Sequence, residues 1–283
     1  MKFKKIKKLQ NIIKVIIFYF WKKKLKKFGN VHLSKKNASL KKIPFSRNKA
    51  WLRPTSSDAS RVQEYFDNIY YSKSYLHKRI LDQKPSILID IGANIGLSTL
   101  SLIEEFKTIK KVIALEPEKN NFEILDLNFK IWSMNFKNVE FLPLNAAITS
   151  DASDIVVQDL SLYDLSKKGT VSGTFSYKPV TNQTNIEKIN NNIVKNISLN
   201  DLVNDIPLDE KIIIKIDIEG GEEYLFKNNT DWLKRTLYFT CEIHDKYHPQ
   251  FINSSKNMIE TIAKNNFAID TKNSSLFLYN RNN

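Results

Sequence analysis

The chain has 283 residues, and 42% of them are apolar, so it can bury a sizeable core and is not globally disordered. Its formal net charge of +14 is uneven, because residues 1–57 hold 18 of the 44 basic residues and no acidic residue. The rest of the chain has 26 basic and 30 acidic residues, a net charge of −4. A body with this charge repels a phosphate backbone, which disfavours a uniformly basic nucleic-acid-binding domain.

Residues 1–28 are predicted to form a basic amphipathic helix that ends near Gly29. Its apolar run is shorter than the roughly 20 residues that span a bilayer, and no A-x-A-like cleavage site follows it. Lysines flank and oppose the apolar face, which suits peripheral contact with an anionic membrane surface through residues 1–30. Packing against the body and a disordered solubilising tail are the alternatives. The apolar positions at helical spacing are Phe3, Ile6, Ile13, Ile16, Ile17 and Phe20.

We divide the chain into an arm with its linker, residues 1–56, and a body, residues 57–283. Residues 37–54 show little periodicity and are predicted to be the linker. The first helix of the body is expected to start near residue 57, where Asp58 can cap it.

The body alternates short apolar segments with segments of helical periodicity. This alternation predicts an α/β fold, a Rossmann-like, doubly wound and mostly parallel sheet with helices on both faces. Residues 151–196 interrupt the pattern and are predicted to be an insertion of short strands or loops. The predicted strands cover residues 87–91, 111–115, 139–144, 212–216 and 237–243, the predicted helices cover 97–106, 118–129, 198–203 and 221–226, and a final hairpin covers 266–269 and 276–279.

Cysteine and glycine are both scarce in this sequence. The single cysteine, Cys241, excludes a disulfide framework and a thiolate metal cluster, and it fits the reducing environment of the cytoplasm. Four of the seven glycines fall in two short motifs, at Gly92, Gly96, Gly220 and Gly221. Such clustering marks places where the backbone needs unusual torsion angles or the close approach of another group.

The segment from Asp90 to Gly96 leaves the first predicted strand of the body and enters a helix. A turn of this kind places backbone N–H groups and a helix N-terminus at the carboxyl edge of a parallel sheet, where α/β proteins bind ligands. The spacing G-x-x-x-G differs from the dinucleotide fingerprint, because Asn94 stands where its second glycine belongs. Glu116, at the end of the next strand, has the usual place of a carboxylate that binds ribose hydroxyls.

A second group of polar residues follows two later strands of the predicted sheet. Asp217 ends a strand that is otherwise mostly apolar, and a carboxylate there needs a partner or a task. Lys215, in the same strand, either pairs with a carboxylate or extends to solvent. Glu219 follows two residues after Asp217, while Glu242 and His244 alternate at the end of the next strand and so share one face. We expect these side chains to converge on the sheet edge that carries the first motif.

These motifs resemble those of the class I S-adenosylmethionine-dependent methyltransferases and, more specifically, of the FkbM-type methyltransferases. The resemblance extends over about residues 87–244, with several motifs in the order and spacing of the family. Two departures are mild: Asn200 stands where the family usually has Asp, and Gly221 stands where it more often has Ala. The matching segments are Asp90–Gly96, Leu115–Pro117, Asn145–Ile148, Ser198–Leu202, Ile214–Glu222 and Glu242–His244.

The resemblance implies S-adenosylmethionine as the cofactor, with Glu116 holding its ribose hydroxyls. It also implies methyl transfer to a hydroxyl, and together with the basic arm it suggests a sugar or glycan precursor as the acceptor. A plain strand-to-helix turn is the alternative role of the two glycines in the first motif. The residues expected to line the methionine and ribose portion of the cofactor are Asp90, Gly92, Ala93, Asn94 and Gly96.

An acceptor hydroxyl is a poor nucleophile until its proton is removed, so such a reaction needs a general base as well as positioning. His244 or Asp217 is the candidate base, and Glu219 and Glu242 are expected to orient the base or the substrate hydroxyls. The alternative roles are structural, because Asp217 and Glu219 can cap the next helix and His244 can be a core or surface histidine. The carboxylates also suit Mg²⁺ or another hard cation, although their spacing is not that of a strong metal motif.

Three other functions stay open on the sequence alone. An RNA methyltransferase of the same fold would use the basic arm for electrostatic contact with its substrate. A non-catalytic scaffold would keep the fold without the chemistry, and the intact cofactor motif argues against it. A dehydrogenase is disfavoured by Asn94 at the position of the fingerprint glycine.

Overall fold

The computed structural model describes residues 38–43, 46–53, 56–152, 156–159, 176–179, 193–245 and 253–282. The basic helix expected at residues 1–28 and most of the insertion expected at residues 151–196 lie outside the described residues. No helix within the described part of the chain has both the length and the apolar character needed to cross a membrane.

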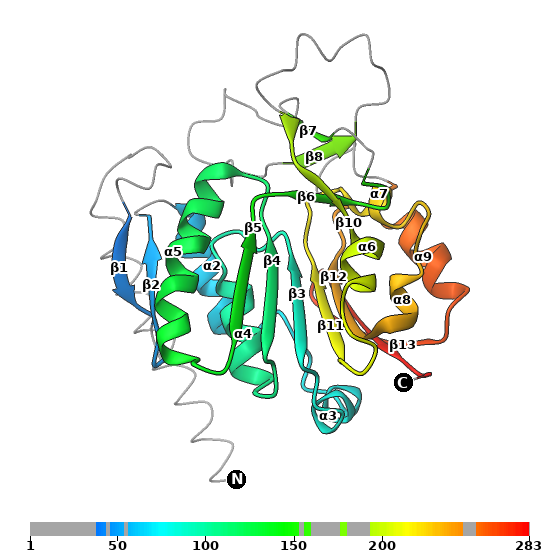
Figure 1. Ribbon diagram of the computed structural model, residues 1–283. Coiled ribbons are helices and arrows are strands. Elements are labelled where there is room, and N and C mark those ends of the chain that lie inside the picture. The colour runs from blue at the N-terminus through cyan, green and yellow to red at the C-terminus, as the bar shows by residue number, and fades with distance from the viewer. Residues whose placement is uncertain are drawn as a thin grey trace.

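A seven-stranded sheet forms the centre of the protein (Figure 1). Its strand order is β13-β14-β12-β11-β3-β4-β5. The five strands from β12 to β5 run parallel, and β14 pairs antiparallel with both of its neighbours. The expected Rossmann-like, mostly parallel α/β sheet is thereby confirmed. The strands are β3 (Ile87–Ile91), β4 (Lys111–Leu115), β5 (Glu140–Leu144), β11 (Ile212–Ile216), β12 (Thr236–Glu242), β13 (Phe267–Lys272) and β14 (Ser275–Asn280).

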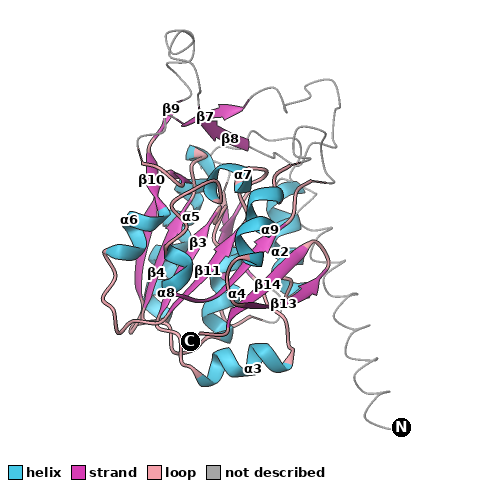
Figure 2. Cartoon of the chain, turned by 90° about the vertical axis from the view of Figure 1, so that its right-hand side faces the viewer, coloured by secondary structure: helices cyan, strands magenta, loops and turns pink. Residues whose placement is uncertain are grey.

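Helices cover both faces of the sheet and bury a separate hydrophobic core on each (Figures 1 and 2). The helices of the first face are α2 (Ser56–Asp67), α4 (Leu97–Glu105) and α5 (Lys119–Asn135). The helices of the second face are α6 (Leu199–Asn204), α7 (Glu222–Leu225), α8 (Trp232–Arg235) and α9 (Lys256–Ala263). Helix α3 (Tyr75–Asp82) lies at the end of the sheet opposite to β7 and β8.

Alternation along the central strands decides which side chain faces which core. In β3, Ile87 and Ile89 belong to the core under α6–α9, whereas Leu88 belongs to the core under α2, α4 and α5. The period of two places Asp90 on the same face as Leu88. Lys215 in β11 lies directly opposite Asp90 in the strand register. The two charged residues are therefore cross-strand neighbours on the face covered by α2 and α4.

An N-terminal hairpin packs on the body where a linker was expected. Strands β1 (Ser39–Lys42) and β2 (Lys49–Leu52) pair antiparallel, and Leu52 is fully buried in the core under α5. The indole N–H of Trp132 in α5 donates to the Lys49 carbonyl at 2.8 Å. The prediction of a linker at residues 37–54 is wrong for this hairpin. Its strands are only four residues long, too short for a recognisable pattern of alternation.

A buried ion pair ties this hairpin to the helix that follows it. The guanidinium of Arg53 lies 2.7 Å from Asp58, and the two side chains are 1% and 0% exposed. Asp58 also accepts a hydrogen bond from the Arg53 backbone N–H at 2.6 Å. The expected helix start near residue 57 is confirmed, but Asp58 lies inside the first turn of α2 and binds Arg53.

The described parts of the expected insertion do contain short strands. Strands β7 (Val156–Asp159), β8 (Ser176–Pro179) and β9 (Ile193–Val194) form a small antiparallel sheet. Strands β6 (Ala147–Thr149) and β10 (Asn196–Ser198) form a parallel pair. The insertion therefore begins and ends at neighbouring points of the body.

Loss of the Asp58 carboxylate should destabilise the fold, because the Arg53 guanidinium would then be buried without its counter-charge. We expect Asp58→Ala to lower the free energy of unfolding by about 3 kcal/mol or more, as measured by urea denaturation. The matched control is Asp126→Ala, which breaks the exposed pair with Lys130 and should change stability by less than about 0.5 kcal/mol. Equal effects of the two substitutions would contradict the prediction.

Candidate active site

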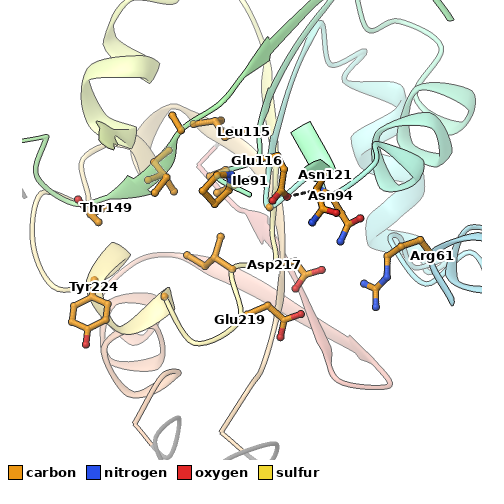
Figure 3. Close-up of a pocket in the computed structure, with 17 residues that line it drawn as sticks. Arg61, Ile91, Asn94, Leu115, Glu116, Asn121, Thr149, Asp217, Glu219 and Tyr224 are labelled. Atoms are coloured by element: carbon orange, nitrogen blue, oxygen red, sulfur yellow. Dashed lines mark hydrogen bonds between the residues drawn. The ribbon is translucent and has the colours of Figure 1, made fainter. Parts of the chain in front are cut away.

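A pocket of about 750 Å³, including its solvent-open part, lies at the carboxyl ends of β3, β4 and β11. Figure 3 shows the carboxylates of Asp217 and Glu219 pointing to the side of the pocket where Arg61 lies, with Tyr224 at the opposite end. The pocket therefore has a polar end and a more apolar end. The lining residues are Arg61, Ile91, Gly92, Asn94, Leu115, Glu116, Pro117, Asn121, Ala146, Ala147, Ile148, Thr149, Asp217, Ile218, Glu219, Gly221 and Tyr224.

The turn after β3 requires glycine at its first position, because the backbone that follows the neighbouring strand lies directly against it. Gly92 has a φ of 74°, and a Cβ atom there would overlap the carbonyl oxygen of Asp217. The two segments are joined by a hydrogen bond from the Asp217 N–H to the Ile91 carbonyl at 3.0 Å. Gly92 thus lets the ends of β3 and β11 come together, and it also lines the pocket.

Two other residues of the first motif lie beneath the pocket and support it. Asp90 is 0% exposed and accepts hydrogen bonds from Ser98 at 2.7 Å and from Thr99 at 2.6 Å, which fixes the start of α4 against β3. Gly96 has a φ of 89° and packs against Leu125 of α5. Neither Asp90 nor Gly96 lines the pocket, and Ala93 borders only a smaller recess beside it.

Glu116 forms a buried anionic wall of the pocket. Its carboxylate accepts hydrogen bonds from the backbone N–H of Asn94 at 2.8 Å and of Glu118 at 2.9 Å. The side-chain amide of Asn121 also binds the carboxylate, and Arg53 donates to the Asn121 oxygen at 2.7 Å. Burial raises the pKa of Glu116 to about 7, although these N–H groups favour the ionised form.

Lys215 connects the two strand ends from below. Its ammonium is 4% exposed, donates to the Gly92 carbonyl at 2.6 Å, and lies 3.3 Å from Asp90 and 3.5 Å from Oδ2 of Asp217. Burial alone would lower the pKa of Lys215, but the two carboxylates raise it above its ordinary value. Of the two roles the sequence leaves open for Lys215, pairing with a carboxylate is confirmed.

His244 is enclosed by carboxylates and is 1% exposed. Its Nδ1 lies 3.0 Å from Glu222, and its Nε2 lies 3.3 Å from Glu219 and 3.5 Å from Oδ1 of Asp217. Burial would lower the pKa of His244, but these carboxylates raise it well above its usual value. Burial would raise the pKa of Asp217, yet Lys215 and His244 hold it below its usual range. His244 thus stands behind Asp217 and Glu219 and is not among the residues that line the pocket.

Glu242 faces a recess next to the pocket, and Asp217 borders both. This recess has about 240 Å³ of empty space and is also lined by Tyr70 and Lys215. Burial, followed by the charge of Asp217, raises the pKa of Glu242 to about 7. The side chains of Asp217, Glu219, Glu242 and His244 are expected to converge on one edge of the sheet. In the structure, Asp217 lies between the pocket, His244 and the recess of Glu242.

Sequence reasoning missed three residues that take part in this arrangement. Arg61, in α2, lies outside both motifs but lines the polar end of the pocket and pairs with Glu64 at 2.8 Å. Asn121 comes from the first turn of α5 and carries no motif signal. Glu222 could have been suspected, because it directly follows the Gly220–Gly221 pair and its charge is buried at 1% exposure.

A pocket at the carboxyl edge of a doubly wound sheet, with an acidic residue after the second strand, is the ligand site of Rossmann-like nucleotide-binding proteins, a group that includes the class I methyltransferases. The FkbM methyltransferase domain family matches residues 90–269, which is more than half of the chain. The chain belongs to this family. S-adenosylmethionine is accordingly its methyl donor.

Comparison with solved structures gives weak overall likenesses. A methyltransferase FkbM from Methylobacillus flagellatus KT is 14% identical, with a TM-score of 0.43 over 79% of this chain and 54% of that chain. The chain thus spans about half the length of that relative. An O-methyltransferase from Bacillus cereus in complex with SAH is 13% identical, with a TM-score of 0.40 over 80% and 91% of the two chains. SAH-bound PaMTH1 from Podospora anserina is 9% identical, with a TM-score of 0.42 over 80% and 88%. A search of the curated proteins finds no match.

The residues present in the pocket fit S-adenosylmethionine. Glu116 is a buried carboxylate whose fixed oxygens face the pocket, as expected for a group that accepts hydrogen bonds from two ribose hydroxyls. Apolar side chains, among them Leu115 and Ile148, provide walls for an adenine ring. The polar end, with Asn94 and Arg61, suits the charged methionine part.

Binding of the cofactor should depend on the protonation of Glu116, because only the ionised carboxylate accepts hydrogen bonds through both oxygens. With a pKa of about 7, Glu116 takes up a proton as the pH falls. We expect the Kd for S-adenosylhomocysteine, measured by calorimetry, to be flat above about pH 8 and to rise by up to about tenfold per pH unit below pH 7.

The Glu116→Gln variant is the control for this prediction. It should bind S-adenosylhomocysteine weakly at every pH and lack the dependence seen in the wild type. A wild-type Kd that stays constant between pH 5.5 and 8 would contradict the role of Glu116.

Proposed function

We propose that the protein transfers a methyl group from S-adenosylmethionine to a hydroxyl of a sugar or glycan precursor. The observation that carries this proposal is the position of Asp217, which borders both the cofactor pocket and the recess that contains Glu242. An acceptor in that recess would meet the cofactor across Asp217. Carboxylates that line such a recess favour a ligand rich in hydroxyl donors.

The chain's own groups supply what a hydroxyl acceptor needs. When bound, S-adenosylmethionine supplies an electrophilic methyl carbon on a sulfonium centre. Glu116 and Asn94 would hold the cofactor, its methyl group would be supplied to the acceptor oxygen with S-adenosylhomocysteine as the leaving group, and a base on the protein would take the hydroxyl proton. The products are a methyl ether, S-adenosylhomocysteine and a proton.

Asp217 is the better placed of the two candidate bases, and because Lys215 and His244 hold its pKa below the usual range, it acts chiefly by orienting the acceptor hydroxyl and only as a weak base. It lines the pocket, whereas His244 lies behind it and is 1% exposed. His244 lies beside the carboxylates of Asp217 and Glu219, with its Nε2 3.5 and 3.3 Å from them, and so its charge helps to set the arrangement of this edge. Positioning of this kind supplies much of the rate acceleration in an in-line transfer.

Replacement of Asp217 should separate catalysis from cofactor binding. We expect Asp217→Asn to lower kcat by about 100-fold or more, because the acceptor loses its positioned carboxylate. The Kd for S-adenosylhomocysteine should change by less than about threefold, because the ribose contacts that we propose for Glu116 do not involve Asp217.

The reaction is followed by mass spectrometry of saccharide acceptors incubated with enzyme and cofactor, where each transfer adds one methyl group. Asp231→Asn, which alters an exposed carboxylate paired with Lys234, is the matched control and should keep full activity. Unchanged turnover of Asp217→Asn would remove this residue from the mechanism, and a methyl group found on RNA would overturn the saccharide assignment.

The basic arm suggests where the enzyme works. Residues 1–57 contain 18 basic and no acidic residues, and the excess suits an anionic membrane surface, where lipid-linked saccharides are held. The body, with its net charge of −4, would be repelled from such a surface, so the arm has to provide the attraction.

Charge removal in the arm should weaken vesicle binding. We expect K22Q/K23Q/K24Q to reduce co-sedimentation with vesicles containing phosphatidylserine, by about 1 kcal/mol per lysine, with no effect on neutral vesicles. K107Q/K110Q/K137Q removes three exposed lysines of the body and serves as the matched control. Equal loss of binding in the two variants, or equal binding to neutral vesicles, would refute the role of the arm.

A further inference from the structure

A histidine and two carboxylates meet next to the cofactor pocket, close enough for small side-chain adjustments to bring all three onto one metal ion. One potential ligand atom each of Asp217, Glu242 and His244 lies within 4.8 Å of the others. These residues come from the ends of the neighbouring strands β11 and β12, so the sheet itself fixes their separation. We propose that Asp217, Glu242 and His244 bind a divalent transition-metal ion of the Mn²⁺ or Zn²⁺ type.

The distances around His244 fit an ion better than direct hydrogen bonds. Its Nε2 lies 3.5 Å from Oδ1 of Asp217, longer than a good charge-assisted hydrogen bond of about 2.7–2.9 Å. Ligand atoms that share a tetrahedral ion, with bonds of about 2.0–2.1 Å, are about 3.3 Å apart. The gap around Nε2 therefore has the size that a shared ion would need.

Glu222 prepares His244 for this role. Its Oε1 lies 3.0 Å from Nδ1 of the imidazole, so Nδ1 can carry the proton while Nε2 presents its lone pair to an ion. Glu222 is itself fixed, because its Oε1 accepts a hydrogen bond from the Ile218 N–H at 3.3 Å. A carboxylate behind a ligating histidine is the usual outer partner of a metal site.

Asp217 divides its two oxygens between two tasks. Oδ2 lies 3.5 Å from the Lys215 ammonium, which is itself anchored to the Gly92 carbonyl at 2.6 Å. Oδ1 is buried and has no hydrogen-bond partner among the described residues, although it faces His244. A buried carboxylate oxygen without a donor is costly, and a cation at this point removes the cost.

The charge balance of the cluster also calls for a cation. Oε2 of Glu222, a side chain that is 1% exposed, likewise has no hydrogen-bond partner within the described part of the chain. Lys215, His244 and the nearby Arg61 can offset at most three of the five negative charges gathered here. The five carboxylates are those of Asp90, Asp217, Glu219, Glu222 and Glu242.

The donor set decides the class of ion. Carboxylates suit Mg²⁺, Ca²⁺ or Mn²⁺, whereas an imidazole nitrogen suits Zn²⁺ or Fe²⁺, so a set of two carboxylates and one imidazole is compatible with Mn²⁺ or Zn²⁺. The role of such an ion in catalysis rests on the proposed methyl transfer, where it would orient the acceptor oxygen and lower the pKa of its hydroxyl. Binding of the ion does not depend on that proposal.

The test is a titration of the full-length, chelator-treated protein with Mn²⁺, in which loss of the free-ion electron paramagnetic resonance signal reports binding. We expect one Mn²⁺ per chain, displaced by Zn²⁺. The Glu242→Gln variant should raise the Kd at least tenfold, and Glu222→Gln should raise it by about 10- to 100-fold through the outer shell.

Glu105→Gln is the matched control, because Glu105 pairs with His77 at 2.9 Å outside this cluster, and its Kd should stay within twofold of the wild type. Thermal unfolding checks that each variant is folded. The absence of saturable Mn²⁺ binding by the wild-type protein overturns the site whatever the variants do. An unchanged Kd in folded Glu242→Gln does the same.

Methyl transfer in the presence of EDTA separates this inference from the proposed function. Transfer that stops in EDTA and returns with Mn²⁺ supports a catalytic ion. Undiminished transfer in EDTA overturns the catalytic role while leaving the methyltransferase function intact. Saturable Mn²⁺ binding without transfer to any saccharide supports the site and contradicts the acceptor.

Discussion

A lysine ammonium buried between two strands is the constraint around which the active-site edge is built. Lys215 and Asp90 are cross-strand neighbours in β11 and β3, and both are almost completely shielded from water. A charge buried in this way is tolerated only if its partners are held in place. The ammonium therefore fixes the Gly92 carbonyl on one strand and the Asp217 carboxylate on the other, and these two groups border the pocket.

In the glycine motif, the sequence correctly marks Gly92 and Gly96 as special positions, but the physical reason for glycine there differs from the expected one. The sequence indicates that Gly92 and Gly96 allow a cofactor to approach the main chain. In the structure, Gly92 is required by the backbone of Asp217 and Gly96 by Leu125, so the primary demand comes from packing inside the protein. The pocket gains from this arrangement because the Asn94 N–H, between the two glycines, is directed to Glu116.

The parallel strands of the sheet can be predicted from the sequence, because each is marked by its own short apolar run. The five parallel strands are short apolar runs ended by polar residues, and their bounds differ by at most one residue from those expected. Helices α3, α8 and α9 were not predicted, because stretches of four to eight residues are too short to establish a helical period. The N-terminal hairpin was not predicted either, because its stability depends on partners that are distant in the sequence, such as Trp132 and Asn128 of α5.

The candidate site likewise has one half that the sequence predicts and one half that it does not. Its cofactor half is built from one turn and the next strand end, so the residues that matter, Asn94 and Glu116, are visible in a short stretch of sequence. Its carboxylate half is assembled from separate segments, and what each group does depends on charges that only the folded chain brings together.

His244 shows the consequence. From sequence it is a candidate base at the carboxyl edge of the sheet, but the fold surrounds it with the carboxylates of Glu222, Asp217 and Glu219 and removes it from the pocket surface. In a buried cluster of this kind, a change at one group alters the electrostatic environment of every other. Chemistry at this edge is therefore a property of the whole cluster, and its members have to be interpreted together.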